Sequence, residues 1–365
     1  MTKLQALTTQ TRPTRRSTPC APYFLALLVV AMTALCLVSS SAFAVDDDDD
    51  DAVCSETARL LFGSCGKEAE DDFLKAQAIC LNVEDEEQAE CNADAVAQRT
   101  ENLQLCRAQL TARFTVCGVL GEDEYDPDFD PVFFDKDFTH LTRPNPYFPL
   151  GIGYRWDYRS GTETVTRKVQ SRTKLIDDVT CLVVNDRVVD DGDLIEDTDD
   201  WYAHAKDGTV WYCGEEVKDF ETFAGDNPNK PELVSIDGSF KVGRDGDKPG
   251  ILFPASPTRG LVFRQEFSLN NAEDIVEILS TSYKFGRDPV LDQFVPKQLA
   301  ERFCSSGNCV VTKDYTPLEP GVFERKYYAR GIGRFLEVNP SQRKISQLVN
   351  CNFDPRCSTS PITTR

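Results

Sequence analysis

Six cysteines near the start of the sequence recur at alternating intervals of 11 and 15 residues. They are Cys54, Cys65, Cys80, Cys91, Cys106 and Cys117. The chain between them is rich in Ala, Glu, Gln, Leu and Arg and has no proline, which is typical of helices. On a helix, an 11-residue step makes nearly whole turns and rises about 16 Å, which is too far for a disulfide. The spacing therefore predicts bridges between different helices of a small bundle, with the connectivity left open.

Two stretches inside this region resemble breaks between helices. Residues 63–66 read GSCG and residues 82–85 read NVED, and both contain residues that favour turns. A metal cluster is the alternative use of the cysteines. It usually needs close ligand pairs such as CxxC, and the six cysteines offer none. Disulfides are therefore the preferred interpretation.

The remaining cysteines extend this interpretation to the whole chain. Of 14 cysteines, Cys20 and Cys36 lie in the N-terminal segment, which leaves an even number. An even count in an exported protein predicts disulfides. The further disulfide candidates are Cys181, Cys213, Cys304, Cys309, Cys351 and Cys357. Only two histidines are present, so ligands for a mixed metal site are scarce, and we expect no cofactor.

The N-terminus has the pattern of a signal peptide. Four basic residues precede the apolar run 24–38, and Ala42-Phe43-Ala44 offers a cleavage site after Ala44. A membrane anchor is the alternative, but the run is shorter than the roughly 20 residues that a spanning helix needs. No later segment is apolar enough to span a bilayer. We therefore expect a periplasmic or secreted protein that begins at Val45.

Charge limits the partners. The net charge of −20 becomes −24 without residues 1–44, which hold four basic and no acidic residues. Such a chain offers no net counter-charge to nucleic acid or to an anionic membrane surface. The expected organisation is 1–44 signal peptide, 45–53 acidic tail, 54–120 cysteine-repeat helical domain, 121–144 acidic linker, 145–350 antiparallel β domain and 351–365 C-terminal tail.

The linker carries alternating aspartates. Asp126, Asp128 and Asp130 offer the oxygen ligands that calcium prefers. An EF-hand loop starting at Asp126 would need glycine in sixth place and glutamate in twelfth, but Pro131 and Asp137 stand there. These aspartates are calcium candidates, and a solvated acidic linker is the alternative.

From residue 145 the pattern changes to strands joined by turns. Alternating runs and four Asp-Gly dipeptides between 191 and 246 predict consecutive hairpins. The fold class is therefore α+β, with a disulfide-stapled helical domain followed by an antiparallel meander that forms a curled sheet or a barrel. Residues 271–284 could form one helix across the sheet.

The clearest hairpin is 197–216, which turns at Asp207-Gly208. A two-residue loop there pairs His204 with Trp211 and Tyr202 with Cys213. It predicts Trp201, Ala203, Ala205, Val210 and Tyr212 on the core face, and His204 as a packed or rim side chain. The same counting places Tyr202 between Cys181 and Cys213, which is too wide for a disulfide unless a bulge shifts the register.

Five stretches of the β region together resemble a family of uncharacterised exported bacterial proteins. They are 145–158 (NPYFPLGIGYRWDY), 200–216 (DWYAHAKDGTVWYCGEE), 238–254 (GSFKVGRDGDKPGILFP), 263–276 (FRQEFSLNNAEDIV) and 315–333 (YTPLEPGVFERKYYARGIG). The resemblance covers roughly 145–340, and the cysteine repeat lies outside it. It implies an exported β domain and no catalytic residue.

Three classes of function remain. An enzyme is disfavoured, because the sequence has no GxSxG elbow, no P-loop and no HExxH helix. A binding protein for an apolar or lipid-like ligand is one hypothesis, since a curled sheet can enclose such a ligand. A non-enzymatic interaction or structural protein of the envelope, with a protein partner, is the alternative.

Overall fold

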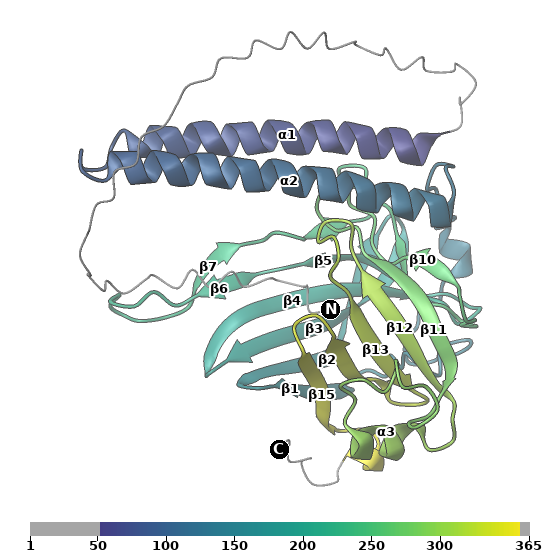
Figure 1. The fold of residues 1–365 in the computed structure, drawn as a ribbon. Helices are drawn as coiled ribbons and strands as arrows, with labels where there is room; N and C mark the ends of the chain where they lie inside the picture. The colour runs from purple at the N-terminus through teal and green to yellow at the C-terminus, as the bar shows by residue number, and fades with distance from the viewer. Residues whose placement is uncertain (1–51, 358–365) are drawn as a thin grey trace. The chain divides into compact units, whose positions relative to one another are not determined.

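The computed structural model describes residues 52–357. The helices α1 (Val53–Cys80) and α2 (Gln88–Leu120) form an antiparallel hairpin (Figure 1). Three disulfides cross it, Cys54–Cys117, Cys65–Cys106 and Cys80–Cys91, with Cα–Cα distances of 5.7, 5.7 and 5.6 Å. In each pair the two residue numbers add up to the same value, so the bridges are the rungs of a ladder. We call these three bridges the disulfide ladder.

The predicted breaks have different outcomes. The chain reverses at 81–87, so the break at 82–85 is present. The break at 63–66 is wrong, because α1 continues through Gly63 and Gly66. A glycine costs a helix only about 1 kcal/mol relative to alanine, and neighbouring turns and the bridge at Cys65 offset that cost. Only Ala58, Ala69 and Cys80 of α1 are buried, so the ladder contributes much of what holds the hairpin together.

The rest of the chain forms a 15-stranded antiparallel sheet that is not closed. Its strands are β1 (Arg155–Ser160), β2 (Glu163–Ile176), β3 (Val179–Asp190), β4 (Asp193–His204), β5 (Val210–Glu216), β6 (Asp219–Glu221), β7 (Glu232–Ser235), β8 (Phe240–Lys241), β9 (Gly250–Phe253), β10 (Val262–Arg264), β11 (Ile275–Tyr283), β12 (Cys309–Tyr315), β13 (Glu324–Ala329), β14 (Gly333–Asn339) and β15 (Lys344–Cys351). The main order is β10-β11-β12-β13-β14-β15-β1-β2-β3-β4-β5-β8. The α+β fold class is thereby confirmed.

The two ends of the curled sheet meet near β9 and β10. The backbone N–H of Lys248 donates to the carbonyl of Phe267 at 3.0 Å, and Gln265 Nε2 donates to the Leu252 carbonyl at 3.2 Å. Gly250 allows this approach, because a Cβ there would lie 1.9 Å from the Gln265 carbonyl oxygen. The ends touch without forming a continuous ladder.

Short helices occupy the connections. The 3-10 helices are η1 (Pro131–Phe133) and η2 (Pro355–Cys357), and the α-helix α3 (Lys297–Cys304) precedes β12. The predicted helix at 271–284 is wrong, because this segment contains β11. Its β-branched Ile275, Val276 and Ile278 are all buried between β10 and β12, an environment that favours a strand.

The β4–β5 hairpin corrects the predicted register. His204 pairs with Val210 instead of Trp211, because the loop holds three residues, with Gly208 at φ +98°. A bulge between Trp201 and Tyr202 then restores the predicted pairing of Trp201 with Gly214. The bulge and a second one in β3–β4 bring Cys181 and Cys213 to a Cα–Cα distance of 6.7 Å, where they form a disulfide. The unbulged register would have kept them apart.

The predicted faces change with that register. Trp211 and Cys213 pack with Trp201, Ala203 and Ala205, whereas Tyr212 packs against Tyr202 on the opposite face, with their rings tilted by 60°. Both faces are covered, so residues on either side are buried. Of the two positions expected for His204, packed or at a rim, the structure shows the packed one. His204 is fully buried, and its Nδ1 donates to the Asp135 carboxylate at 2.9 Å.

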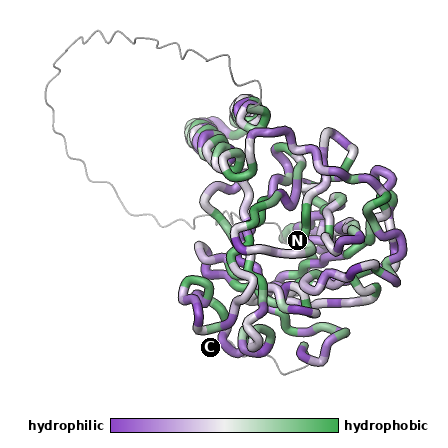
Figure 2. Tube along the Cα trace, turned by 90° about the vertical axis from the view of Figure 1, so that its right-hand side faces the viewer, coloured by the Kyte–Doolittle hydropathy of each residue, from purple (hydrophilic) through white to green (hydrophobic). Residues whose placement is uncertain are grey.

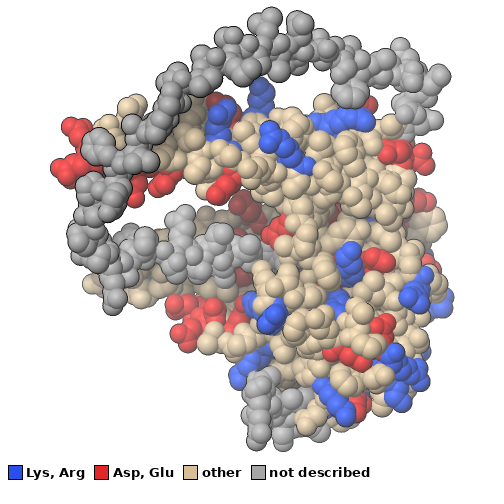
Figure 3. Space-filling model, in the orientation of Figure 1, with Lys and Arg blue, Asp and Glu red and all other residues tan. Residues whose placement is uncertain are grey.

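Figure 2 views α1 and α2 nearly end-on and shows them beside the sheet, each carrying apolar residues among polar ones. Within the described residues, no helix is both long and apolar enough to cross a bilayer. Figure 3 shows acidic side chains gathered at the hairpin end where α1 leads into α2. That turn contains Glu84, Asp85, Glu86 and Glu87, all exposed.

Candidate functional site

A cavity of about 150 Å³ lies where the open end of the helical hairpin meets the β10 region. We call it the junction cavity. Its apolar lining includes Val53, Leu61, Val116, Phe267, Leu269 and Pro317. Its charged lining comprises Arg113, Asp123, Glu124, Lys248, Arg264 and Glu273. Apolar surface predominates in this lining, and apolar surface with polar groups placed within it is the usual composition of a small-molecule site.

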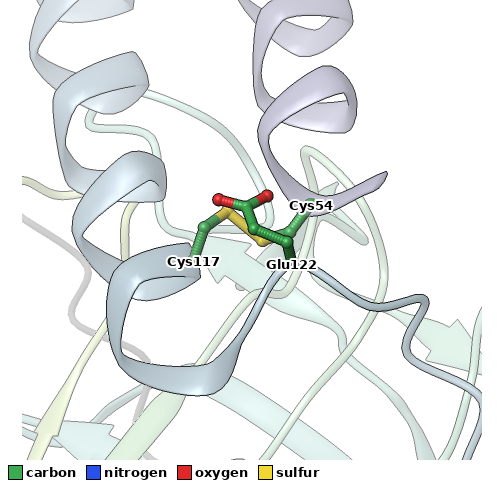
Figure 4. A group of neighbouring side chains, drawn as sticks. All are labelled: Cys54, Cys117 and Glu122. Carbon is green, nitrogen blue, oxygen red and sulfur yellow. A yellow bond between two sulfur atoms is a disulfide. The ribbon is translucent and has the colours of Figure 1, made fainter. Parts of the chain in front are cut away.

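The disulfide ladder fixes the helical wall of this cavity. Cys54, in the first turn of α1, is bonded to Cys117, in the last turn of α2 (Figure 4). Glu122, just after α2, accepts hydrogen bonds from the Ser55 N–H at 2.8 Å and from its hydroxyl at 2.7 Å. These contacts hold the start of α1 against the end of α2. A disulfide therefore joins the two helices where they form the wall of the cavity.

A buried ion pair joins the helices to the sheet. Arg113 on α2 donates from Nε and Nη2 to the two carboxylate oxygens of Glu273, at 2.9 and 2.7 Å. Both side chains are about 5% exposed. Glu273 also accepts from the Asn270 N–H at 2.6 Å. A bidentate pair with an added hydrogen bond offsets much of the cost of burying two charges, so this pair is internally neutralised.

Arg264, the last residue of β10, sits in a different environment. Its guanidinium lies 5.5 Å from the ring centroid of Tyr125 and 5.2 Å from that of Phe267. The Tyr125 hydroxyl is occupied, because it donates to the Pro249 carbonyl at 2.8 Å. Burial lowers the pKa of the Arg264 guanidinium below its ordinary value. In the described part of the chain, no carboxylate oxygen lies within 4.0 Å of the Arg264 nitrogens.

A second, more open hollow of about 330 Å³ lies further along the hairpin. Its lining is mixed: the polar and acidic residues Glu68, Asp72, Asn102, Gln109 and Asn270 stand among apolar ones such as Leu105 and Leu318. The exposed carboxylates of Glu68 and Asp72 suit solvent better than an apolar molecule. The junction cavity is therefore the better candidate for an apolar ligand.

The face of the sheet that carries Arg167 and Asp186 has buried ion pairs among its apolar residues. Buried pairs join Arg167 to Asp186 at 2.5 Å, Lys326 to Asp314 at 2.9 Å and Arg334 to Glu337 at 2.5 Å. The charges of Arg167 and Asp186, on β2 and β3, also act on Arg334, on β14, so the pairs face a common interior. Burial raises the pKa of Glu324 beside this cluster. Such a lining disfavours the expected enclosure of an apolar ligand by the sheet itself.

The candidate residues named from the sequence fall in several places. All twelve cysteines outside the N-terminal segment form disulfides, with Cys304–Cys309 and Cys351–Cys357 closing short loops. Asp126 accepts from Lys248 Nζ at 2.8 Å, and Asp130 accepts from the Val132 N–H at 2.8 Å as the cap of η1. Asp128 accepts from the Asp130 N–H at 3.3 Å. Calcium binding by these three aspartates stays a prediction.

Within residues 52–357, one group has three metal-type ligand atoms close together. It comprises Cys54, Cys117 and Glu122, shown in Figure 4. The two sulfurs are bonded to each other and the carboxylate is bound by Ser55, so the group is a structural closure rather than a metal centre.

The sequence reasoning missed the charged residues of the junction cavity. Arg113 lies among other arginines of a helix, and nothing near it in sequence indicates Glu273 as its partner. Arg264 and Phe267 do lie in a stretch that carries the family resemblance, 263–276. The available signal in the sequence was an arginine that lies among aromatic residues in a short, strand-like stretch.

Comparisons with known proteins give little further information. No protein-family model matches the chain, and no curated protein matches it. One solved structure is similar in part, a protein from Bacteroides fragilis described as exported and with a YmcC-like fold. It shares 12% identity with a TM-score of 0.28, over 56% of this chain and 98% of that one. At that TM-score the similarity carries no argument.

Proposed function

We propose that this protein is an exported, disulfide-stabilised binding protein whose ligand occupies the junction cavity. The observation that supports this proposal is a cavity of about 150 Å³ whose lining is largely apolar. An apolar cavity of about that size takes up a molecule as small as benzene. The ligand is therefore a small apolar molecule or the apolar segment of a lipid-like one.

Export is part of the proposal. Six disulfides are typical of oxidising compartments, and residues 1–44, which lie outside the described residues, have the pattern of a signal peptide. The resemblance of five stretches to exported bacterial proteins supports the same compartment, periplasmic or secreted. N-terminal sequencing of the mature protein should begin at Val45. Soluble protein that retains Met1 would contradict export.

Cavity filling tests the binding site. Leu61 lines the cavity, whereas its neighbour Leu60 is 70% exposed. We expect hexanol to raise the melting temperature of the wild type and of Leu60→Trp in a saturable way. Leu61→Trp should fold but lose this response, because the indole occupies the cavity. Native mass spectrometry of the purified protein should also show a co-purified small apolar molecule. An unchanged hexanol response in Leu61→Trp would refute this site.

A second candidate function is protein docking by the helical hairpin. The hairpin exposes several apolar residues near its turn, including Leu74, Ile79 and Leu81, each more than half exposed, and exposed apolar residues that gather in one place are typical of protein contacts. Light scattering of the full mature chain, compared with Leu74→Lys and Ile79→Lys, tests for self-association through this surface. If the chain stays monomeric at all concentrations tested, self-association through this surface is excluded.

A further inference from the structure

Arg264 is the cation of the junction cavity whose charge is least compensated. Arg113 is engaged by both oxygens of Glu273, and Lys248 is 2.8 Å from Asp126. Arg264 instead lies beside the paired rings of Tyr125 and Phe267, whose centroids are 4.9 Å apart, with Nη2 3.8 Å from Cys54 Sγ. A disulfide sulfur is a weak acceptor and an aromatic ring stabilises a cation only modestly, so neither replaces a carboxylate.

The surroundings of Arg264 favour an incoming anion. A half-buried guanidinium without a counter-charge is destabilised by its desolvation, and an anion placed beside it recovers that cost. Among residues 52–357, the groups that act on its charge are Tyr125, Tyr315 and Glu273, of which Glu273 is the carboxyl. Since Glu273 is held by Arg113, it is not available to neutralise Arg264 as well.

The remaining charges of the cavity limit the charge of that anion. Asp123 and Glu124 also line it, and both are exposed. Their repulsion is screened by solvent but grows with the charge of the ligand. One guanidinium facing two exposed carboxylates therefore suits a monoanion better than a dianion. The planar fork of an arginine matches a carboxylate in geometry.

We propose that the junction cavity takes a small amphiphilic carboxylate, bound through its charged group by Arg264 and through its hydrocarbon by Leu61, Val116 and Leu269. This inference rests on the proposed function and adds the class of ligand. Arg264 would be the specificity-determining residue, since the apolar lining alone does not distinguish an acid from an alcohol.

The test compares four hexyl probes by titration calorimetry on the full mature chain: hexanoate, hexanol, hexylamine and hexyl phosphate. The wild type should bind hexanoate about tenfold or more tightly than hexanol, as expected for a charged hydrogen bond in a partly buried site. Hexylamine should bind more weakly than hexanol. Hexyl phosphate should bind more weakly than hexanoate. These four measurements need no variant, so a folding defect cannot obscure them.

Arg264→Met then removes the charge and keeps an apolar side chain of similar length. It should bring hexanoate down to the affinity of hexanol and leave hexanol unchanged. The matched control is Arg259→Met, at an exposed arginine just before β10, which should keep the preference for hexanoate.

The outcomes separate the two proposals. If the wild type binds hexanoate and hexanol with equal affinity, the role of Arg264 is overturned and the binding function stands. The same conclusion follows if Arg264→Met still prefers hexanoate to hexanol. Tighter binding of hexyl phosphate would overturn the carboxylate assignment. Failure of all four probes to bind would overturn the proposed function together with this inference.

Discussion

At the scale of single residues, the two histidines have opposite environments. His204 is fully buried and donates to Asp135, which also accepts from the Thr142 N–H and hydroxyl at 3.0 and 2.6 Å. His140 is exposed and lies on the linker. The bond from His204 ties the linker to the end of β4, so His204 has a structural role that the sequence pattern did not reveal.

His204→Ala should therefore destabilise the protein by about 1–3 kcal/mol, because a buried hydrogen bond is lost and Asp135 keeps fewer donors. His140→Ala, the matched control, should change the free energy of unfolding by no more than about 0.5 kcal/mol. Chemical denaturation measures both. Equal effects of the two substitutions would be inconsistent with the buried contact.

Glu324 gives a pH dependence. Burial, together with Glu337 and Asp314, raises its pKa well above the ordinary 4.5. The folded state therefore retains a proton that the unfolded state releases. Its contribution to stability is complete below about pH 4.5 and is lost as the pH rises toward the folded-state pKa.

Glu324→Gln imitates the protonated carboxyl and should remove this dependence. We expect the variant to gain stability relative to the wild type as the pH rises from 4 to 8. Urea denaturation across that range measures the difference, with the exposed Glu232→Gln as the control. A difference that stays constant with pH would show that Glu324 is ionised in the folded state.

At the scale of elements, the disulfides of the ladder are not independent. Cys54–Cys117 closes 63 residues of sequence and Cys80–Cys91 closes 11. With Cys65–Cys106 intact, however, Cys54–Cys117 constrains only the 11 residues on each helix beyond that bridge. Because each doubling of loop length changes the closure free energy by only about 0.6 kcal/mol, the outer bridge should stabilise by only about that much more than the inner one.

Replacing Cys54 and Cys117 by alanine should thus lower the free energy of unfolding slightly more than replacing Cys80 and Cys91. Each loss should be about 2–4 kcal/mol. Thermal denaturation followed by circular dichroism compares the pairs. A loss for the outer pair that exceeds the loss for the inner pair by about 1.5 kcal/mol or more would mean that the bridges act separately.

The elements also show what sequence reasoning can supply. Helical composition and cysteine spacing predicted a cross-linked helical region, and alternation predicted most strands, because these patterns report local burial. The register of β4–β5 was not predictable, since a bulge at Tyr202 and a loop of three residues leave no mark that alternation can show. The segment at 275–283 was misassigned, because its strand conformation depends on the neighbours β10 and β12.

At the scale of the whole molecule, the cavity depends on contacts between residues distant in sequence. Arg113 and Glu273 are 160 positions apart, and Gln109 Nε2 donates to the Leu318 carbonyl at 2.9 Å. No local pattern indicates which carboxylate a helical arginine will meet. The sequence predicts that the cysteines form disulfides. It does not predict the junction cavity, which is the candidate site.

The Arg113–Glu273 pair should couple the hairpin to the sheet. Arg113→Met leaves a buried carboxylate without its counter-charge and should cost about 3–5 kcal/mol. Adding Glu273→Gln should recover much of that loss, because the remaining side chain is neutral and can still accept from the Asn270 N–H. Denaturation of the single and double variants measures the recovery. A double variant that is less stable than Arg113→Met would contradict this account.

The uneven spacing of the ladder has a consequence for oxidative folding. In the native alignment the three cysteines of α1 meet the three of α2. If one helix slides along the other, at most one cysteine of each helix lies opposite a cysteine of its neighbour. The reason is that the intervals of 11 and 15 residues differ, so no shifted alignment matches two pairs of cysteines at once. Equal intervals would have let two wrong bridges form together. A misaligned hairpin is therefore held by a single bond, which thiol exchange can undo, while the correct one is held by three.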